Sequence, residues 1–233
     1  MLEMNKIIKL YNKGIKNWTK KISKQRYQEA KLVAANKVKV CRKIILFDLE
    51  VDENFKNISL IYGIFFRGLE DLTDLSEIVA KYEWYKDNES VEKAWLLLQN
   101  CKERFESSSK IVMVPSEIKE TIDSFLDTIE KDFLALFGPG LYVSPEILIK
   151  KSICSICKTD YRTCPHLPNH LYNGKICRIE PTEIGPGNCV VILPRPKDPR
   201  CRLWPWHQEK EGDGLKIHNI PLIISFKIDD FLD

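Results

Sequence analysis

The chain has 233 residues, of which 44 % are hydrophobic and 10 % aromatic, and its net charge is +3. This length and composition are typical of a folded protein with one large or two small domains, and they exclude an intrinsically disordered chain. No apolar run approaches the roughly 18 residues of a membrane span, and the charged start is unlike a signal peptide, so we expect a cytoplasmic protein without a transmembrane segment.

The charges are unevenly distributed along the chain. Residues 1–43 contain thirteen lysines and arginines against two glutamates, a net charge of +11, whereas residues 44–92 have a net charge of −8. Such polarity is typical of a basic arm that meets nucleic acid or an anionic membrane surface. It is equally typical of two segments that pack on each other, and the sequence does not separate these interpretations.

The N-terminal segment has the pattern of an amphipathic basic helix. Apolar residues recur at three- and four-residue intervals from Ile7 to Ile22, and lysines occupy the other faces. A second helix is predicted over residues 20–43, before an acidic bend over residues 48–57. The apolar run 58–66 cannot be assigned to strand or helix by periodicity, and we predict a helix because its neighbours are helical.

A helical hairpin is predicted next. Its first helix begins near residue 74, carries Tyr82 and Tyr85 on its apolar face, and ends near residue 87. Asn88 is predicted to cap the second helix, which continues to Phe105. The short break between the two helices predicts an antiparallel pair.

The clearest helix begins at Ser116 and is ended by Gly138-Pro-Gly140, because glycine can take a left-handed cap and proline cannot continue a helix. Beyond this point, proline and glycine separate short β-like segments. The sequence therefore predicts an α+β fold, with a helical domain over 1–140 and a smaller, zinc-binding, β-rich domain over 141–233. Strands are expected at 175–179, 189–193 and 215–228, and turns at 185–187 and 212–214.

Three cysteines and a histidine lie within thirteen residues of the C-terminal part. Zinc takes four such ligands tetrahedrally, and two residues between a pair of cysteines suit a turn around the metal. Four protein ligands leave no open position for water, so the pattern predicts one structural zinc ion rather than a catalytic one. The first-choice ligands are Cys154, Cys157, Cys164 and His166.

The sequence does not decide which residue is the fourth ligand. His170 lies four residues after His166 and can replace it, and Cys177 can replace either histidine. The simpler interpretation is that these cysteines are small buried residues without a metal, but a CxxC motif followed by CxH favours zinc.

The stretch 153–202 resembles a short cysteine-rich module of phage and prophage-type proteins. The resemblance lies in CSIC-x-x-DYR-x-CPH and in the segment Leu171–Cys177, which contains a Tyr-x-Gly sequence. The module's CxxC and CxH motifs hold zinc, so the resemblance implies the same four ligands, a phage-related or host-defence setting and no catalytic activity. The chain departs from the module at Lys158, where glycine is usual, and in Gly185-Pro-Gly187 before Cys189.

The sequence favours a non-enzymatic zinc-stabilised binding or adaptor protein with a protein partner. No P-loop, GxSxG, HExxH or GxGxxG motif is present. A less favoured alternative is a metal-dependent HNH-like nuclease, in which His166, His170 and Asn173 act beside the zinc. The sequence does not establish the oligomeric state.

Another alternative is a nucleic-acid-binding protein that uses the basic N-terminal helices and a tryptophan-arginine patch. Aromatic rings between cations can stack bases while the cations meet phosphates. The same residues can also anchor a protein interface, or cover the core of the small zinc region. The patch consists of residues 201–207, which include Trp204 and Trp206, with the nearby cations Arg195, Lys197, Arg200 and Arg202.

Overall fold

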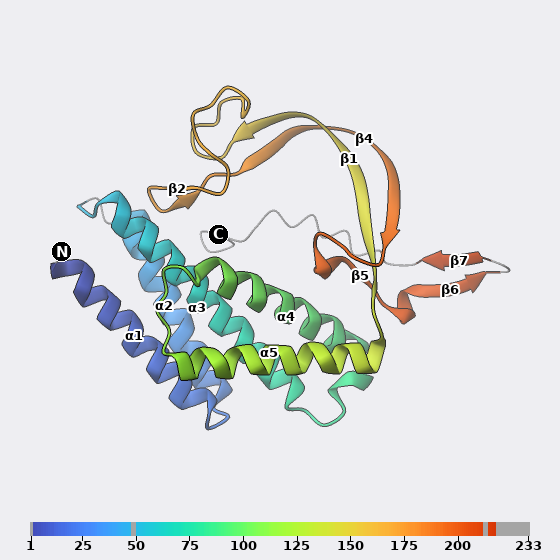
Figure 1. The fold of residues 1–233 in the computed structure, drawn as a ribbon, viewed down its shortest axis with the longest axis horizontal. Coiled ribbons are helices and arrows are strands. Elements are labelled where there is room, and N and C mark those ends of the chain that lie inside the picture. Colours follow the sequence, from blue (N-terminus) through green and yellow to red (C-terminus); the bar gives the residue numbers. More distant parts are fainter. Residues whose placement is uncertain (1, 48–49, 212–213, 218–233) are drawn as a thin grey trace.

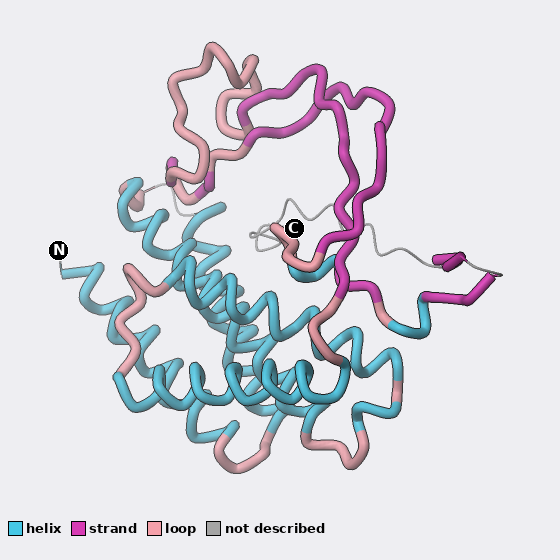
Figure 2. The backbone as a smooth tube through the Cα atoms, turned by 45° about the vertical axis from the view of Figure 1, so that its right-hand side comes forward, coloured by secondary structure: helices cyan, strands magenta, loops and turns pink. Residues whose placement is uncertain are grey.

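The computed structural model describes residues 2–47, 50–211 and 214–217. In these residues the N-terminal part is formed by α-helices and the C-terminal part by small antiparallel sheets, which confirms the predicted α+β fold with a helical N-terminus. A long β-ribbon arches over the helices (Figure 1), and Figure 2 shows the long helices on one side of the molecule and the strands, with short helical segments between them, on the other. The helices are α1 (Leu2–Ile22), α2 (Tyr27–Phe47), α3 (Glu53–Val79), α4 (Asn88–Ser108) and α5 (Ser116–Phe137).

Helix α1 packs its apolar stripe against α3. Tyr11, Ile15 and Trp18 are at most 3 % exposed. The Tyr11 hydroxyl donates to Ser59 Oγ at 3.4 Å, and Trp18 Nε1 donates to Thr73 Oγ1 at 2.9 Å. The stripe predicted from its three- and four-residue spacing therefore faces the core.

Helix α2 begins seven positions later than predicted, because a turn with Gln25 in the left-handed region (φ 55°) separates it from α1. It also ends four positions later than predicted.

The predicted acidic bend is shorter than expected. Asp52 ends it by accepting a hydrogen bond from the Phe55 N–H at 2.7 Å, which is the usual way to cap a helix N-terminus, and α3 begins at Glu53.

The apolar run 58–66 is helical, as predicted, and it forms the first half of the long helix α3. Residues 59–66 are all buried, because α2 packs on one side of α3 and α4 on the other. A helix covered on all its faces has no polar side, which explains why periodicity could not assign this run.

The predicted helix over residues 74–87 is wrong at both ends, because residue 74 lies inside α3 rather than at the start of a helix. Helix α3 ends at Val79, and a turn with Glu83 in the left-handed region (φ 56°) follows. Tyr82 is 92 % exposed, so it does not belong to an apolar face. The cap of α4 is Asp87, whose side chain accepts from the Ser90 N–H at 3.0 Å, and not Asn88.

Helix α5 begins at Ser116 and is followed by Gly138 with φ 69°, as predicted. Its fully buried Phe133 packs edge-on against Trp84 and Trp95, with ring centroids 5.4 and 5.1 Å apart, and lies 6.1 Å from Trp204. The helical core therefore includes an aromatic side chain from the C-terminal part. None of the described helices has the length and apolarity that crossing a membrane requires.

The C-terminal part is dominated by a ribbon of two antiparallel strands, β1 (Leu141–Cys154) and β4 (Ile179–Leu193). The turn predicted at residues 185–187 is wrong, because these residues lie inside β4, where the pairing with β1 shifts register. Of the strand expected at 215–228, the structure describes residues 215–217; residues 212–213 and 218–233 lie outside the description. The short strands are β2 (Leu171–Tyr172), β3 (Lys175–Ile176), β5 (Arg202–Leu203), β6 (Gln208–Glu211) and β7 (Gly214–Ile217).

Arg202 joins the two parts of the molecule. It is only 3 % exposed, and its guanidinium carbon lies 4.8 Å from the ring centre of Trp95 and 4.6 Å from that of Trp204. Its Nη2 donates to the carbonyls of Phe137 and Gly138 at 3.2 and 2.8 Å. Arg202 thus satisfies the carbonyls at the end of α5, where a helix has no partners of its own.

Trp206 and Arg200 of the predicted tryptophan-arginine patch also face the protein, whereas the nearby Arg195 and Lys197 are exposed. Trp206 stacks on Trp204 and donates from Nε1 to Glu92 at 2.6 Å. Arg200 pairs with Glu103 on α4 at 3.0 Å. These contacts support the interpretation of the patch as a core cover and leave the buried Arg202 and Trp204 unable to stack bases.

Candidate metal centre

The four predicted ligands converge at the tip of the ribbon. Cys154 is the last residue of β1, and the loop between β1 and β4 contributes Cys157, Cys164 and His166. One donor atom from each residue lies within 4.8 Å of the others. Tetrahedral ligands of zinc are about 3.8 Å apart, so the side chains are close to the arrangement that such an ion requires.

The CxxC motif forms a tight turn around the first sulfur. The Cys154 N–H donates to the Thr159 carbonyl at 2.9 Å, and the Lys158 N–H donates to the Cys154 carbonyl at 2.8 Å. The Ile156 N–H points at Cys154 Sγ, 3.4 Å away. An N–H group directed at sulfur stabilises a thiolate, which is the form that binds metal.

Lys158 closes this turn in the left-handed region, with φ 60°. Because this conformation is costly for residues with a side chain, we expect Lys158→Gly to retain the metal and to raise the free energy of unfolding by up to about 1 kcal/mol. Thermal unfolding of the metal-loaded protein measures the gain. Lys158→Ala removes the same exposed ion pair with Glu180 and keeps the strain, so it should show no gain. Equal stabilities of the two variants would contradict this account.

His166 supplies the observation that best fits a metal. Its Nδ1 is buried and has no hydrogen-bond partner in the described structure. The ring packs edge-on against Tyr172 with centroids 4.6 Å apart, and the Tyr172 hydroxyl accepts from the Leu167 N–H at 3.0 Å. A buried nitrogen beside three thiols is costly unless something binds it, and a neutral imidazole nitrogen is a zinc ligand.

The two competing ligands differ in position. His170 is exposed, and its Nδ1 lies 3.1 Å from the Pro168 carbonyl oxygen, outside the group of four donors. Cys177 is fully buried, and its Sγ lies 3.6 Å from Cys154 Sγ. The structure therefore brings His166 rather than His170 into the cluster and places Cys177 directly beside it.

The two neighbouring thiols ionise very differently. Burial opposes ionisation of Cys154, but the N–H groups of Cys157 and Ile156, together with the thiols of Cys177 and Cys164, outweigh it and lower its pKa to about 7. Burial and the hydrogen bond with Cys154 raise the pKa of Cys177 to about 11. At neutral pH Cys154 is thus readily available as a thiolate, whereas Cys177 is a thiol.

A small hairpin anchors this region to the helices. Asn173 and Gly174 both have positive φ, 47° and 76°, as a two-residue turn between β2 and β3 requires. Their N–H groups donate to Glu53 at 3.1 Å and to Asn57 at 2.7 Å, both at the start of α3. These two bonds hold the β2–β3 turn against the N-terminal end of α3.

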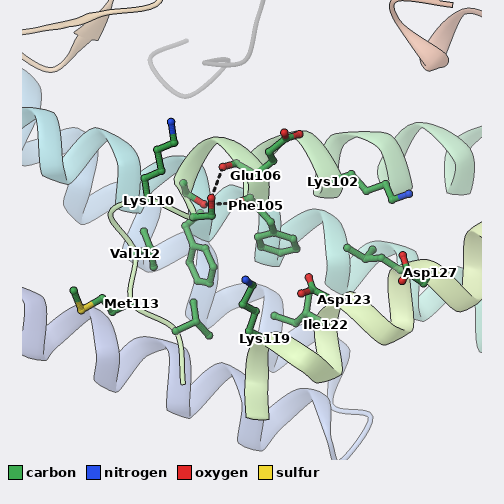
Figure 3. A pocket seen from close by; sticks show the side chains of 15 residues that line it. Lys102, Phe105, Glu106, Lys110, Val112, Met113, Lys119, Ile122, Asp123 and Asp127 are labelled. Carbon is green, nitrogen blue, oxygen red and sulfur yellow. Dashed lines mark hydrogen bonds between the residues drawn. The ribbon is translucent and has the colours of Figure 1, made fainter. Parts of the chain in front are cut away.

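A separate pocket of about 760 Å³ lies between α4, α5 and the loop that joins them (Figure 3). Its floor is apolar and includes Phe105 and Ile122, while its rim carries both lysines and acidic residues, such as Lys119 and Asp123. Charges of both signs on the rim do not indicate one class of ligand, so we assign it no role.

Comparisons with protein-family models, with curated proteins and with solved structures found no match to this chain. The candidate metal centre is therefore supported by its own geometry and donor set.

Proposed function

We propose that this protein is a non-enzymatic zinc-stabilised binding or adaptor protein, and that its β1–β4 ribbon binds a protein partner. The convergence of Cys154, Cys157, Cys164 and His166 at the tip of the ribbon is the observation that carries the proposal. Three thiols and an imidazole are a donor set that suits zinc, and four protein ligands are typical of a structural site. Zinc bound there would fix the end of the ribbon by cross-linking the end of β1 to the first half of the loop that follows it.

The middle of the ribbon supports a binding role. Two strands on their own are only marginally stable in water, and among the described residues β5 extends the sheet only at Leu141 and Tyr142. The ribbon nevertheless exposes large apolar side chains, which in a protein often mark an interaction site. Those between 41 and 57 % exposed are Leu141, Leu148, Ile149, Ile184, Val190, Val191 and Ile192.

Quantitative affinity capture from the native cell tests this function. We expect Ile184→Ser/Val190→Ser to reduce the recovery of a specific protein at least about tenfold, since each lost apolar contact weakens binding by on the order of 1 kcal/mol or more. The control is Leu32→Ser/Leu136→Ser, which removes apolar side chains of similar exposure from α2 and α5. The purified partner must then bind the wild type and the control equally. A folded ribbon variant that binds every captured protein as tightly as the control contradicts the proposal.

We extend the proposal to the setting of that partner. The resemblance of residues 153–202 to the phage-type module suggests a phage-related or anti-phage assembly. This extension is supported by the CxxC and CxH motifs alone.

A further inference from the structure

An unbroken stripe of lysines follows the outer face of α1. Lys9, Lys13, Lys16 and Lys20 are separated by four, three and four positions, and all four are exposed. On a helix these intervals keep the side chains on one face, about 4.5–6 Å apart along the axis. The stripe is therefore a regular row of positive charge about 16 Å long.

The acidic part of the chain does not neutralise this row. Lys31 pairs with Asp74 at 2.7 Å, and that contact lies on α2 and α3. None of the four stripe lysines has an acidic partner in the described parts of the chain. A fifth cation adds to the row, because Lys37 lies over Gly14, and burial together with the nearby charge of Lys13 lowers the pKa of Lys37.

The surroundings of the row decide which polyanion it suits. An amphipathic helix binds a lipid surface by inserting its apolar face, and here Tyr11, Ile15 and Trp18 already pack on α3. Protein interfaces are depleted in lysine and depend on aromatic and arginine anchors, which the stripe lacks. Evenly spaced point charges without base-reading side chains instead match a phosphate backbone.

We propose that the lysine stripe of α1 binds the phosphate backbone of a nucleic acid without reading its sequence. This second binding surface is independent of the ribbon and its zinc site. Each lysine that meets a phosphate releases a counterion, so binding weakens steeply with salt. With four contacts to a single strand, affinity should fall about 50-fold between 50 and 200 mM salt, and further for duplex DNA.

Fluorescence anisotropy with labelled oligonucleotides tests the proposal. The affinities for three oligonucleotides of the same sequence are compared: single-stranded DNA, duplex DNA and RNA. The oligonucleotide that binds most tightly indicates the class of nucleic acid that the stripe prefers. In the variant Lys9→Gln/Lys13→Gln/Lys16→Gln/Lys20→Gln we expect at least about tenfold weaker binding at 50 mM salt and a much shallower salt dependence. Arginine at the same four positions should preserve binding, because it retains the charge.

The matched control removes four exposed lysines elsewhere, with the same change in net charge. Binding close to that of the wild type is expected for the control and for the ribbon variant Ile184→Ser/Val190→Ser. Equal losses in the stripe variant and the control would overturn the proposal, as would a wild-type protein that binds none of the three nucleic acids or prefers anionic vesicles. The control lysines are Lys93, Lys110, Lys119 and Lys131.

Discussion

Replacing Cys154 and Cys157 with serine is expected to abolish the binding of about one zinc ion per chain and to unfold the tip of the ribbon. The structure places both sulfurs in the group of four donors, and serine cannot supply a thiolate. A zinc site of this type contributes on the order of 10 kcal/mol to folding of the segment that it organises. The helices should retain their structure, because their apolar side chains form a core without the cysteine cluster.

Elemental analysis of tag-free protein purified without chelator measures the zinc content. Limited trypsin digestion measures the order of the tip, since Lys158 and Arg162 lie in its loop and should be cleaved faster in the variant. Cys101→Ala is the matched control, because that thiol is buried between the helices and donates to the Gly68 carbonyl at 3.6 Å. A zinc-free wild-type protein, with trypsin cleavage equal to that of the double variant, would show that the cluster is ordinary core.

Replacing Arg202 with alanine is expected to lower the free energy of unfolding by about 3 kcal/mol. The substitution leaves the carbonyls of Phe137 and Gly138 without their donor and opens the space between Trp95 and Trp204. A hydrogen bond from a charged donor contributes about 1.5–3 kcal/mol, and a desolvated cation–π contact contributes about 2 kcal/mol. A substantial loss of stability is therefore expected even after the surrounding side chains relax. Urea unfolding, followed by tryptophan fluorescence, reports directly on this cluster.

Two further variants test the geometric explanation. Arg202→Lys retains the charge but lacks the planar group, so it should recover only a small part of the loss. Gly140→Ala leaves Arg202 in place but puts a Cβ 2.7 Å from its Nε, so it should destabilise the same contacts. Full recovery by lysine would show that charge alone matters.

The candidate site was largely predictable because metal ligands are few and their spacing is local. The four ligands follow from CxxC and CxH, and the structure brings all four together. The spacing favoured His166 but left His170, four residues later, as an alternative ligand. The fold decides this by burying His166 beside Tyr172 and leaving His170 exposed.

The sequence by itself determined the fold class, the start and end of α5, and the core-facing stripe of α1, because caps and helical periodicity depend on neighbouring residues. Only the tertiary structure decided the extent of α3, whose apolar run is covered by α1, α2 and α4 together. It also decided the role of Arg202 and Trp204, which look like a surface patch in the sequence and are buried against Trp95 and the end of α5. Contacts between residues a hundred positions apart depend on how the helices pack, and no local pattern in the chain records them.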